Sequence, residues 1–229
     1  MKILATADIH GNRKIIQKLK DAAEDVDLVL ICGDIGGKNY PIPSIREFGE
    51  SQIADEFYLD MELRELKAKS RYILGNDDWF ESRAGGRYLS NPSYIDGLTF
   101  APFEWVSPTP FNTNREINQN MMQYNLEKLT EHGLDWKNTV IIAHMPPLGA
   151  GDILYNGNHC GSSEIRNWIE SFQPKLWLCG HIHEDNSVNS IGDTLVFNCA
   201  CRHERNKFAG WVIDTETLDF ERVTAHSRL

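Results

Sequence analysis

The feature that most restricts the fold of this chain is a series of short apolar runs that each end in polar residues. Runs such as Leu28–Cys32 and Val140–Ala143 are interpreted as buried β-strands. Five runs lead into polar groups with the sequences Asp8-Ile9-His10, Gly33-Asp34, Gly75-Asn76-Asp77-Asp78, His144-Met145-Pro146-Pro147 and Gly180-His181-Ile182-His183. Because ligands of open α/β sheets bind outside the carboxyl ends of the strands, we predict that these groups meet along one rim of the fold.

Segments with helical periodicity separate the apolar runs and define the fold class. Apolar residues three or four positions apart predict four helices, with faces at Ile15, Leu19 and Ala22, at Ile53, Phe57 and Met61, at Ile117, Met121 and Tyr124, and at Ile165, Trp168, Ile169 and Phe172. Further strands are predicted near Leu98–Phe103 and, after Glu184, in residues 194–197, 211–214 and 218–223. This alternation with a β-rich end indicates an α/β or α+β protein with one continuous core, and we treat residues 1–229 as a single domain.

The charge balance limits the possible partners. The chain has 23 basic and 33 acidic residues, a formal net charge of -10. It lacks the general phosphate attraction of proteins that coat nucleic acids, so polymeric nucleic acid is not an expected partner. A small phosphorylated substrate remains compatible, because a bound metal ion can dominate the charge of a site. The sequence shows neither a membrane-spanning apolar stretch nor a signal-like N-terminus, so we expect a cytoplasmic protein.

The five cysteines are predicted to be free thiols, because their number is odd and a chain of 229 residues does not need disulfides to fold. Cys199 and Cys201 lie two positions apart, which on a strand would place both on one face. They are interpreted as a buried pair, with a metal or redox role as the alternative.

The residue types at the predicted rim are those that hold first-row divalent metal ions. Carboxylate, imidazole and amide oxygen groups suit such ions, and the lack of cysteine among the candidates argues against a closed thiolate zinc site. Each motif alone is weak evidence, but five of them at successive strand ends predict a dinuclear site. Two ions about 3.5–4 Å apart make a hydroxide available near neutral pH and clamp the attacking and leaving oxygens of an in-line displacement.

Together, these motifs resemble the calcineurin-like metallophosphoesterase superfamily over residues 8–183. The resemblance implies a two-sheet β-sandwich flanked by helices, and hydrolysis of a phosphoester by a hydroxide between two ions. It implies that one ion is bound by Asp8, His10, Asp34 and His183, and the other by Asp34, Asn76, His144 and His181, with Asp34 as the bridging ligand. The sequence leaves Mn, Fe, Zn and Ni open as the metals.

One position departs from the family pattern. Many members carry Gly-Asn-His-Asp or Gly-Asn-His-Glu, whose histidine is associated with leaving-group protonation or phosphate binding, whereas this chain has Asp77 followed by Asp78. Two nearby dications would favour ionised Asp77, which makes it a poor general acid and a source of repulsion for an anionic phosphate. Asp77 is interpreted either as a supporting or solvent-facing residue or as one with a direct role.

Other polar residues complete the candidates. His159, in a glycine-rich loop, is either a substrate-binding or acid residue or an ordinary loop histidine, and Asn198 is a candidate for orienting the rim. The run Arg202, His203, Arg205 and Lys207 is interpreted as a solvated turn, with phosphate binding as the alternative. The candidates for catalytic roles are therefore Asp34, Asn76, Asp77 and His159.

The leading functional interpretation is hydrolysis of a phosphodiester, favoured because the usual histidine acid is missing. A phosphomonoesterase acting on nucleotides is the alternative within enzymes. A non-catalytic protein-binding scaffold, as in the retromer subunit of this fold, is less favoured because all the matched ligands are present. Substrate specificity is assigned to the loops at residues 36–46, 79–95 and 150–161, and the oligomeric state is not readable from the sequence.

Overall fold

A computed structural model describes residues 1–37, 44–82 and 85–224, and its β-strands form two sheets. The first sheet has the strand order β11-β10-β1-β2-β3. Its members are β1 (Lys2–Thr6), β2 (Leu28–Cys32), β3 (Lys69–Ile73), β10 (Ala209–Asp214) and β11 (Phe220–Thr224). β1, β2 and β3 run parallel, and β10 is antiparallel to β1, so the sheet is mixed.

The second sheet is also mixed, with the order β4-β5-β6-β7-β9-β8. Its members are β4 (Ser93–Ile95), β5 (Leu98–Phe103), β6 (Thr139–Ala143), β7 (Leu176–Cys179), β8 (Val188–Ile191) and β9 (Thr194–Asn198). The central strands β5, β6, β7 and β9 are parallel, so their carboxyl ends lie along one edge. The sequence did not predict the short edge strands β4 and β8.

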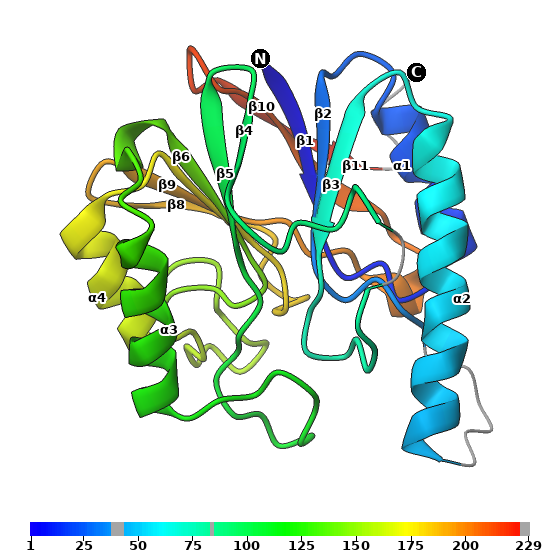
Figure 1. Cartoon of the computed structure of the whole chain (residues 1–229), viewed down its shortest axis with the longest axis horizontal. Coiled ribbons are helices and arrows are strands. Elements are labelled where there is room, and N and C mark those ends of the chain that lie inside the picture. Colours follow the sequence, from blue (N-terminus) through cyan, green and yellow to red (C-terminus); the bar gives the residue numbers. More distant parts are fainter. Residues whose placement is uncertain (38–43, 83–84, 225–229) are drawn as a thin grey trace.

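Helices cover the outer face of each sheet, which gives four layers (Figure 1). The helices are α1 (Arg13–Ala22), α2 (Ile45–Arg64), α3 (Gln119–Glu131) and α4 (Ser163–Phe172), with two single 3₁₀ turns, η1 (Trp136–Asn138) and η2 (His203–Arg205). α1 and α2 pack on the first sheet, and α3 and α4 pack on the second (Figure 1). The predicted two-sheet sandwich flanked by helices is therefore confirmed.

The period-2 alternation of a strand explains how both faces of each sheet become buried. In β1, Ile3 and Ala5 face the space between the sheets, where they pack with Phe100 of the second sheet. Leu4 points the other way and packs with Leu19 of α1. Because both faces are covered, the central strands are mostly apolar, and β2 has no polar residue.

Local signals place the helix ends. Ser162 caps α4 by accepting a hydrogen bond from the backbone N–H of Ile165, and Asn12 caps α1 in the same way. This second cap matters for function because Asn12 follows closely after Asp8 and His10, so α1 begins where the first predicted ligand loop ends.

Two predicted helix faces do not face the core. In α2, Phe57 and Met61 are 49% and 60% exposed, and in α3 Met121 and Tyr124 are also exposed. The buried face of α2 instead includes polar residues such as Gln52, whose side chain donates to the backbone carbonyl of Asp77 at 2.6 Å. Apolar spacing missed this face because hydrogen bonds, rather than apolar character, make its burial possible.

The cysteines are free and both Cys199 and Cys201 are buried, as predicted, but the two do not lie on one face of a strand. β9 ends at Asn198, before both of them. Cys199 packs between the sheets and Cys201 packs on the helix side of the first sheet. In the described part of the chain, none of the helices combines the length and apolar character that crossing a bilayer requires.

Candidate metal centre

The loops that follow β1 and β2 are tied together at the carboxyl edge of the first sheet. The backbone N–H of Asp8 donates to the carbonyl of Gly33 at 3.1 Å, and that of His10 donates to the carbonyl of Asp34 at 2.9 Å. Asp8, His10 and Asp34 have φ values of 59°, 45° and 52°. Non-glycine residues rarely adopt this left-handed conformation, and where they do they often mark functional sites. The chain here turns sharply and directs these side chains into the rim.

A first group of candidate ligands, termed the buried cluster, consists of Asp8, Asp34 and His144. Their ligand atoms lie within 4.8 Å of one another. His144 Nδ1 donates to the backbone carbonyl of Cys32 at 2.7 Å, so its Nε2 faces Asp34 Oδ2 at 3.4 Å. A ring hydrogen bond of this kind fixes the orientation of a metal-binding histidine.

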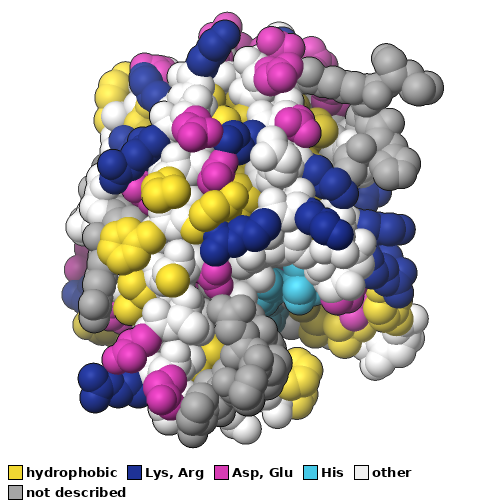
Figure 2. All heavy atoms as spheres, turned by 90° about the vertical axis from the view of Figure 1, so that its right-hand side faces the viewer, with side chains coloured by type: hydrophobic (Ala, Val, Ile, Leu, Met, Phe, Trp, Pro, Cys, Tyr) yellow, Lys and Arg dark blue, Asp and Glu magenta, His cyan; other side chains and the backbone are white. Residues whose placement is uncertain are grey.

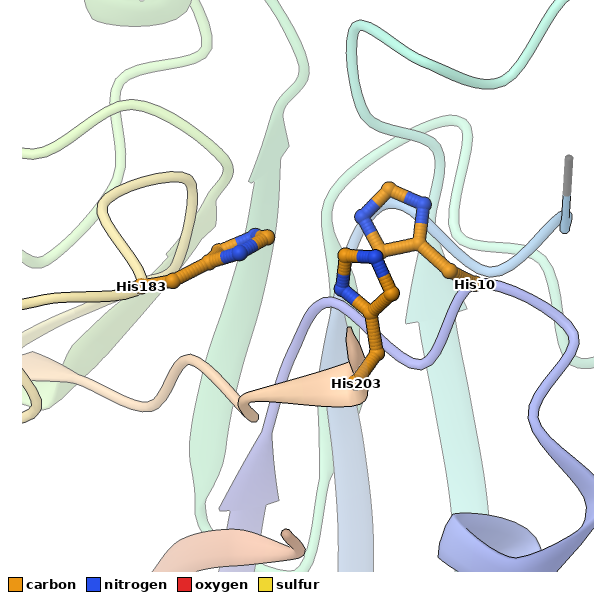
Figure 3. Close-up of side chains that lie close together, drawn as sticks. All are labelled: His10, His183 and His203. Carbon is orange, nitrogen blue, oxygen red and sulfur yellow. The ribbon is translucent and has the colours of Figure 1, made fainter. Parts of the chain in front are cut away.

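A second group, termed the imidazole cluster, consists of His10, His183 and His203, whose ligand atoms also lie within 4.8 Å of one another. The rings of His10 and His203 lie side by side, and His183 points toward them from the opposite side (Figure 3). His183 Nε2 is 3.1 Å from Asp8 Oδ1, which links this cluster to the buried one. Histidine side chains are visible in a hollow of the molecular surface (Figure 2).

Asp34 lies between the two clusters. Its Oδ2 is 3.5 Å from His10 Nε2 and 3.4 Å from His144 Nε2. Its Oδ1 accepts a hydrogen bond from the backbone N–H of Asp77 at 2.8 Å. One carboxylate oxygen therefore faces an imidazole of each cluster, which is the placement that a shared ligand requires.

Two glycines leave room for these side chains. A Cβ added at Gly33, where φ is 91°, would lie 2.6 Å from His144 Nδ1. A Cβ at Gly75 would overlap the carboxylate of Asp34. The glycines in the Gly-Asp and Gly-Asn motifs are therefore required by the close approach of ligand side chains to the backbone.

The two remaining predicted ligands, Asn76 and His181, come from loops whose backbone N–H groups donate to the carboxylates of the buried cluster. Asn76 Nδ2 donates to Thr113 Oγ1 at 2.7 Å, which fixes the orientation of its amide. The backbone N–H of His181 donates to Asp8 Oδ2 at 3.0 Å, and its ring centroid is 5.2 Å from that of His144. The structure thus links six of the seven predicted metal ligands by direct contacts, and the loop of Asn76 contacts Asp34 through the backbone N–H of Asp77.

Comparison with known proteins agrees with this geometry, since residues 1–185 match the calcineurin-like phosphoesterase family. The chain belongs to this family. It is therefore a metal-dependent enzyme that hydrolyses phosphoesters, as predicted.

The similar sequences come from distant organisms. An uncharacterised protein of Methanocaldococcus jannaschii is 28% identical over 203 residues, which are 86% of this chain and 87% of the relative. A UPF0046 protein of Caenorhabditis elegans is 29% identical over 187 residues, and the match covers 76% of this chain and 64% of the nematode protein.

Solved structures share the fold of this phosphoesterase at low sequence identity. TT1561 of Thermus thermophilus has a TM-score of 0.70 at 16% identity, with 98% of this chain and 99% of the other covered. A structure described as a novel archaeal phosphodiesterase has a TM-score of 0.51 at 14% identity, with the same coverage. At these identities the likeness shows the fold alone.

Members of the family bind divalent metal ions, and the residues of this phosphoesterase fit such ions. Within the described residues, six buried side-chain atoms have no hydrogen-bond partner, and all but one of them belong to the two clusters or Asn76. These atoms are Asp8 Oδ1, His10 Nδ1, Asn76 Oδ1, His144 Nε2 and His203 Nδ1. Buried polar atoms are normally satisfied, so their concentration here fits a set of metal ligands.

Burial and nearby carboxylates divide the imidazoles into two kinds. Burial would lower the pKa of His144, but the carboxylate of Asp34 outweighs it and raises this pKa to about 10. Asp8 likewise overcomes burial at His183 and raises its pKa to about 9. Burial prevails at His10 and lowers its pKa to about 3. Because metal ligands must be neutral imidazoles, His144 and His183 release protons when ions bind, whereas His10 does not.

Asp77 and Asp78 are buried next to the candidate ligands. The Oδ2 of Asp77 lies 3.6 Å from His10 Nδ1, and Asp77 is buried, so it does not face solvent. Asp78 accepts hydrogen bonds from the backbone N–H groups of Gly36 and Gly75, both at 2.8 Å. Burial, and then the charge of Asp34, raises the pKa of Asp78 to about 7. Asp78 therefore joins the Gly-Asp and Gly-Asn loops instead of orienting a histidine.

His159 and Asn198 occupy different surroundings. His159 Nδ1 contacts Asp152 Oδ1 at 2.7 Å, and its side chain belongs to neither cluster. Its catalytic role stays a prediction. Asn198 is buried, and its Nδ2 donates to the carbonyls of Gly151 at 2.7 Å and Ile182 at 2.9 Å. Asn198 thus holds the loop that carries His181 and His183, in the orienting position expected for it.

Sequence reasoning did not assign His203 to the metal centre. Its segment was interpreted as a solvated turn, yet the structure stacks its ring against His10, with centroids 3.9 Å apart. Only the presence of a histidine in the basic run after β9 could have signalled this position. Residues 38–43 and 83–84, parts of the predicted specificity loops, lie outside the described residues.

Proposed function

We propose that this phosphoesterase hydrolyses a phosphodiester with two divalent ions held on either side of Asp34. The observation that carries the proposal is the placement of Asp34 Oδ2 within 3.5 Å of both His10 Nε2 and His144 Nε2. The ion on one side would be held by Asp8, His10, Asp34 and His183, and the ion on the other by Asp34, Asn76, His144 and His181. Bound divalent ions supply Lewis-acid charge and make a water-derived nucleophile available near neutral pH.

The chain itself contributes a fixed arrangement of ligands. The carbonyl of Cys32 orients His144, the backbone N–H of Asp77 holds Asp34, and the backbone N–H of His181 holds Asp8. Backbone groups move less than long side chains, so the ligands keep their positions while substrate enters. Such preorganisation is the main way in which an enzyme stabilises developing charge.

The preference for a diester follows from Asp77. Its carboxylate is buried 3.6 Å from His10 Nδ1, in the motif where many relatives have a histidine. A phosphate monoester carries up to two negative charges and a diester carries one, so a buried carboxylate opposes the monoester more strongly. Two nearby dications would keep Asp77 ionised, so it cannot readily protonate a leaving group. The substrate must therefore have a leaving group of low pKa, which can depart without being protonated by the enzyme.

Metal-loaded protein tests this proposal. Chelator-treated protein is reloaded separately with Mn, Fe, Zn or Ni, and kcat/KM is measured for bis(p-nitrophenyl) phosphate and for p-nitrophenyl phosphate. We expect faster turnover of the diester and, across aryl diesters, a steep dependence of rate on leaving-group pKa. Faster monoester turnover with every metal would support the phosphomonoesterase alternative. Binding of two ions without any turnover would support a scaffold.

A further inference from the structure

The η2 turn is fastened to two loops that carry candidate ligands. Asn12, at the end of the His10 loop, donates from Nδ2 to the backbone carbonyl of His203 at 3.0 Å. On the other side, Arg202 Nε donates to the backbone carbonyl of His183 at 3.2 Å. The turn is therefore held between the chain segments that deliver the other two members of the imidazole cluster. His203 is not a side chain on a free surface loop.

The ring of His203 faces both neighbours. Its centroid is 3.9 Å from that of His10 and 5.0 Å from that of His183. Figure 3 shows the three side chains close together. Its Nδ1 is buried and has no hydrogen-bond partner among the residues that the structure describes. The carboxylate oxygen Glu204 Oε2 lies 3.8 Å from it, which is beyond hydrogen-bond distance. This nitrogen is available to a ligand bound inside the cluster.

The distances suit one metal ion. The three histidines place one ring nitrogen each within 4.8 Å of the others. A Zn–N bond is about 2.0–2.1 Å long, so two nitrogens on one ion can be at most about 4.2 Å apart. The three nitrogens would therefore have to move closer together, by up to about an ångström, to surround a common centre.

We propose that His203 is an additional ligand of the ion bound by His10 and His183. This proposal rests on the proposed dinuclear centre and specifies one of its two ions. That ion would be held by three imidazoles as well as the carboxylates of Asp8 and Asp34, so its site is the more nitrogen-rich of the two. Imidazole ligands suit Zn, Fe and Ni, whereas oxygen ligands suit Mn. The imidazole side of the centre should therefore select against Mn.

The test separates coordination from ring packing. His203→Phe keeps a flat ring next to His10 but removes both nitrogens, and His132→Phe makes the same change at an exposed histidine after α3. Zn affinity is measured on the full chain, without substrate, by competition with a chromophoric chelator. We expect His203→Phe to weaken one of the two ions by about 10-fold or more, the scale of losses at metal centres. The other ion, and both ions of His132→Phe, should be unaffected.

X-ray absorption of protein loaded with one equivalent of Zn supplies a second measurement. If the stronger-bound ion is the one beside His203, the number of imidazoles around Zn should fall by one in His203→Phe. If it is the other ion, the protein is loaded with two equivalents and the mean number should fall by one half.

Several outcomes would overturn the proposal. Unchanged Zn affinities in His203→Phe, or equal weakening of both ions, would do so. A lower affinity with an unchanged number of imidazoles around Zn would make His203 a packing residue and would also contradict the proposal. His203→Asn, measured in the same way, replaces the phenylalanine variant if that variant melts below the parent in chelator. Lack of phosphoester turnover would contradict the proposed function without affecting this result, because metal affinity is measured without substrate.

Discussion

The buried cluster and the imidazole cluster lie at the same rim but differ in charge and access. The buried cluster combines two carboxylates with one histidine, and none of its side chains is more than 5% exposed. The imidazole cluster has three histidines, of which His183 and His203 are 25% and 29% exposed. The carboxylate ligands thus lie where the fold excludes water, and the mostly neutral imidazole ligands lie where solvent reaches. The two halves of one centre should therefore respond differently to mutation and to pH.

The difference has an electrostatic cause. Buried carboxylates require nearby positive charge, and in the buried cluster His144 provides it together with backbone N–H groups. Burial alone would raise the pKa of Asp34, but His144 and His10 beside it keep this pKa far below its usual value. The imidazoles of His10 and His203 remain neutral because burial penalises their charged form. Removing Asp34 should disturb both clusters, and removing one imidazole should disturb only its own side.

Asp34→Asn is expected to give the largest effect. It removes the charge that the two clusters share, so kcat/KM should fall by at least about 10²–10³-fold, the loss seen when one charge-stabilising group is removed from an active site. Metal content after identical dialysis should fall for at least one ion. The control is Asp60→Asn, which removes another buried carboxylate, in α2, where it pairs with Arg64 and Arg87. Near-normal turnover with both ions bound to Asp34→Asn would show that this carboxylate is not shared.

Removal of one imidazole from each cluster should separate the two ions. We expect His144→Ala to lose the ion held with Asn76 and His181, and His183→Ala to lose the ion held with His10, each with an affinity loss of roughly 10–100-fold or more. Elemental analysis of each variant after graded dialysis measures the two losses. Loss of the same ion from both variants would contradict the division into two clusters.

The pH dependence of stability should distinguish the clusters in protein kept in chelator. The pKa values of His144 and His183 are raised to about 10 and about 9. A raised pKa adds stability that is complete below the ordinary value of about 6.5 and disappears as pH rises through the folded-state values. The free energy of unfolding should therefore fall between pH 7 and 10, by an amount on the order of a few kcal/mol.

Urea unfolding at several pH values measures this dependence. His144→Gln should flatten the curve, because it removes the imidazole whose pKa is raised most, and His10→Gln should leave the slope almost unchanged, because its pKa is lowered. Equal slopes for the parent and His144→Gln would show that the buried ion pair does not control stability in this range. Metal affinity should change in the opposite direction and rise with pH, because His144 and His183 must lose protons to bind ions.

Asp77→His is expected to have the smallest effect and acts next to the imidazole cluster. A histidine titrates near neutral pH and can carry a proton to the leaving oxygen. A well-placed general acid contributes roughly 10²–10⁴-fold, and an introduced one will fit imperfectly, so we expect a gain of about 10-fold or less. The ratio of monoester to diester turnover, measured with both ions bound, should rise. An unchanged ratio would mean that the loops around the site, rather than Asp77, set the preference.

The parts of the centre that could be predicted are those in which sequence neighbours are also spatial neighbours. Asp8, Asp34 and His144 each follow a strand within two residues, so the strand carries them to the edge of the sheet. The parallel pairing of the central strands then brings these edges together, and this pairing is itself implied by apolar runs alternating with helices. The predicted strand over Leu98–Phe103 agrees with β5 for the same reason, because its pattern is local.

The parts that could not be predicted depend on contacts between distant segments. The apolar spacing of Phe57 and Met61 indicated a helix correctly but not its buried face, since Gln52 is buried through a hydrogen bond to the Asp77 loop. The contact between the Asp77 carboxylate and His10 is equally non-local, because the two residues lie far apart along the chain.

The sequence by itself therefore determined the fold class, the family and seven candidate metal ligands, because each is encoded within a few residues of a strand. Only the tertiary structure decided which of these ligands form the buried cluster and which form the imidazole cluster, and that His203 joins the second. His203 lies 20 residues beyond His183 along the chain, and local sequence does not specify the separation of their rings. That separation is set by hydrogen bonds from Asn12 and Arg202, which form only when the packed sheets bring three loops together.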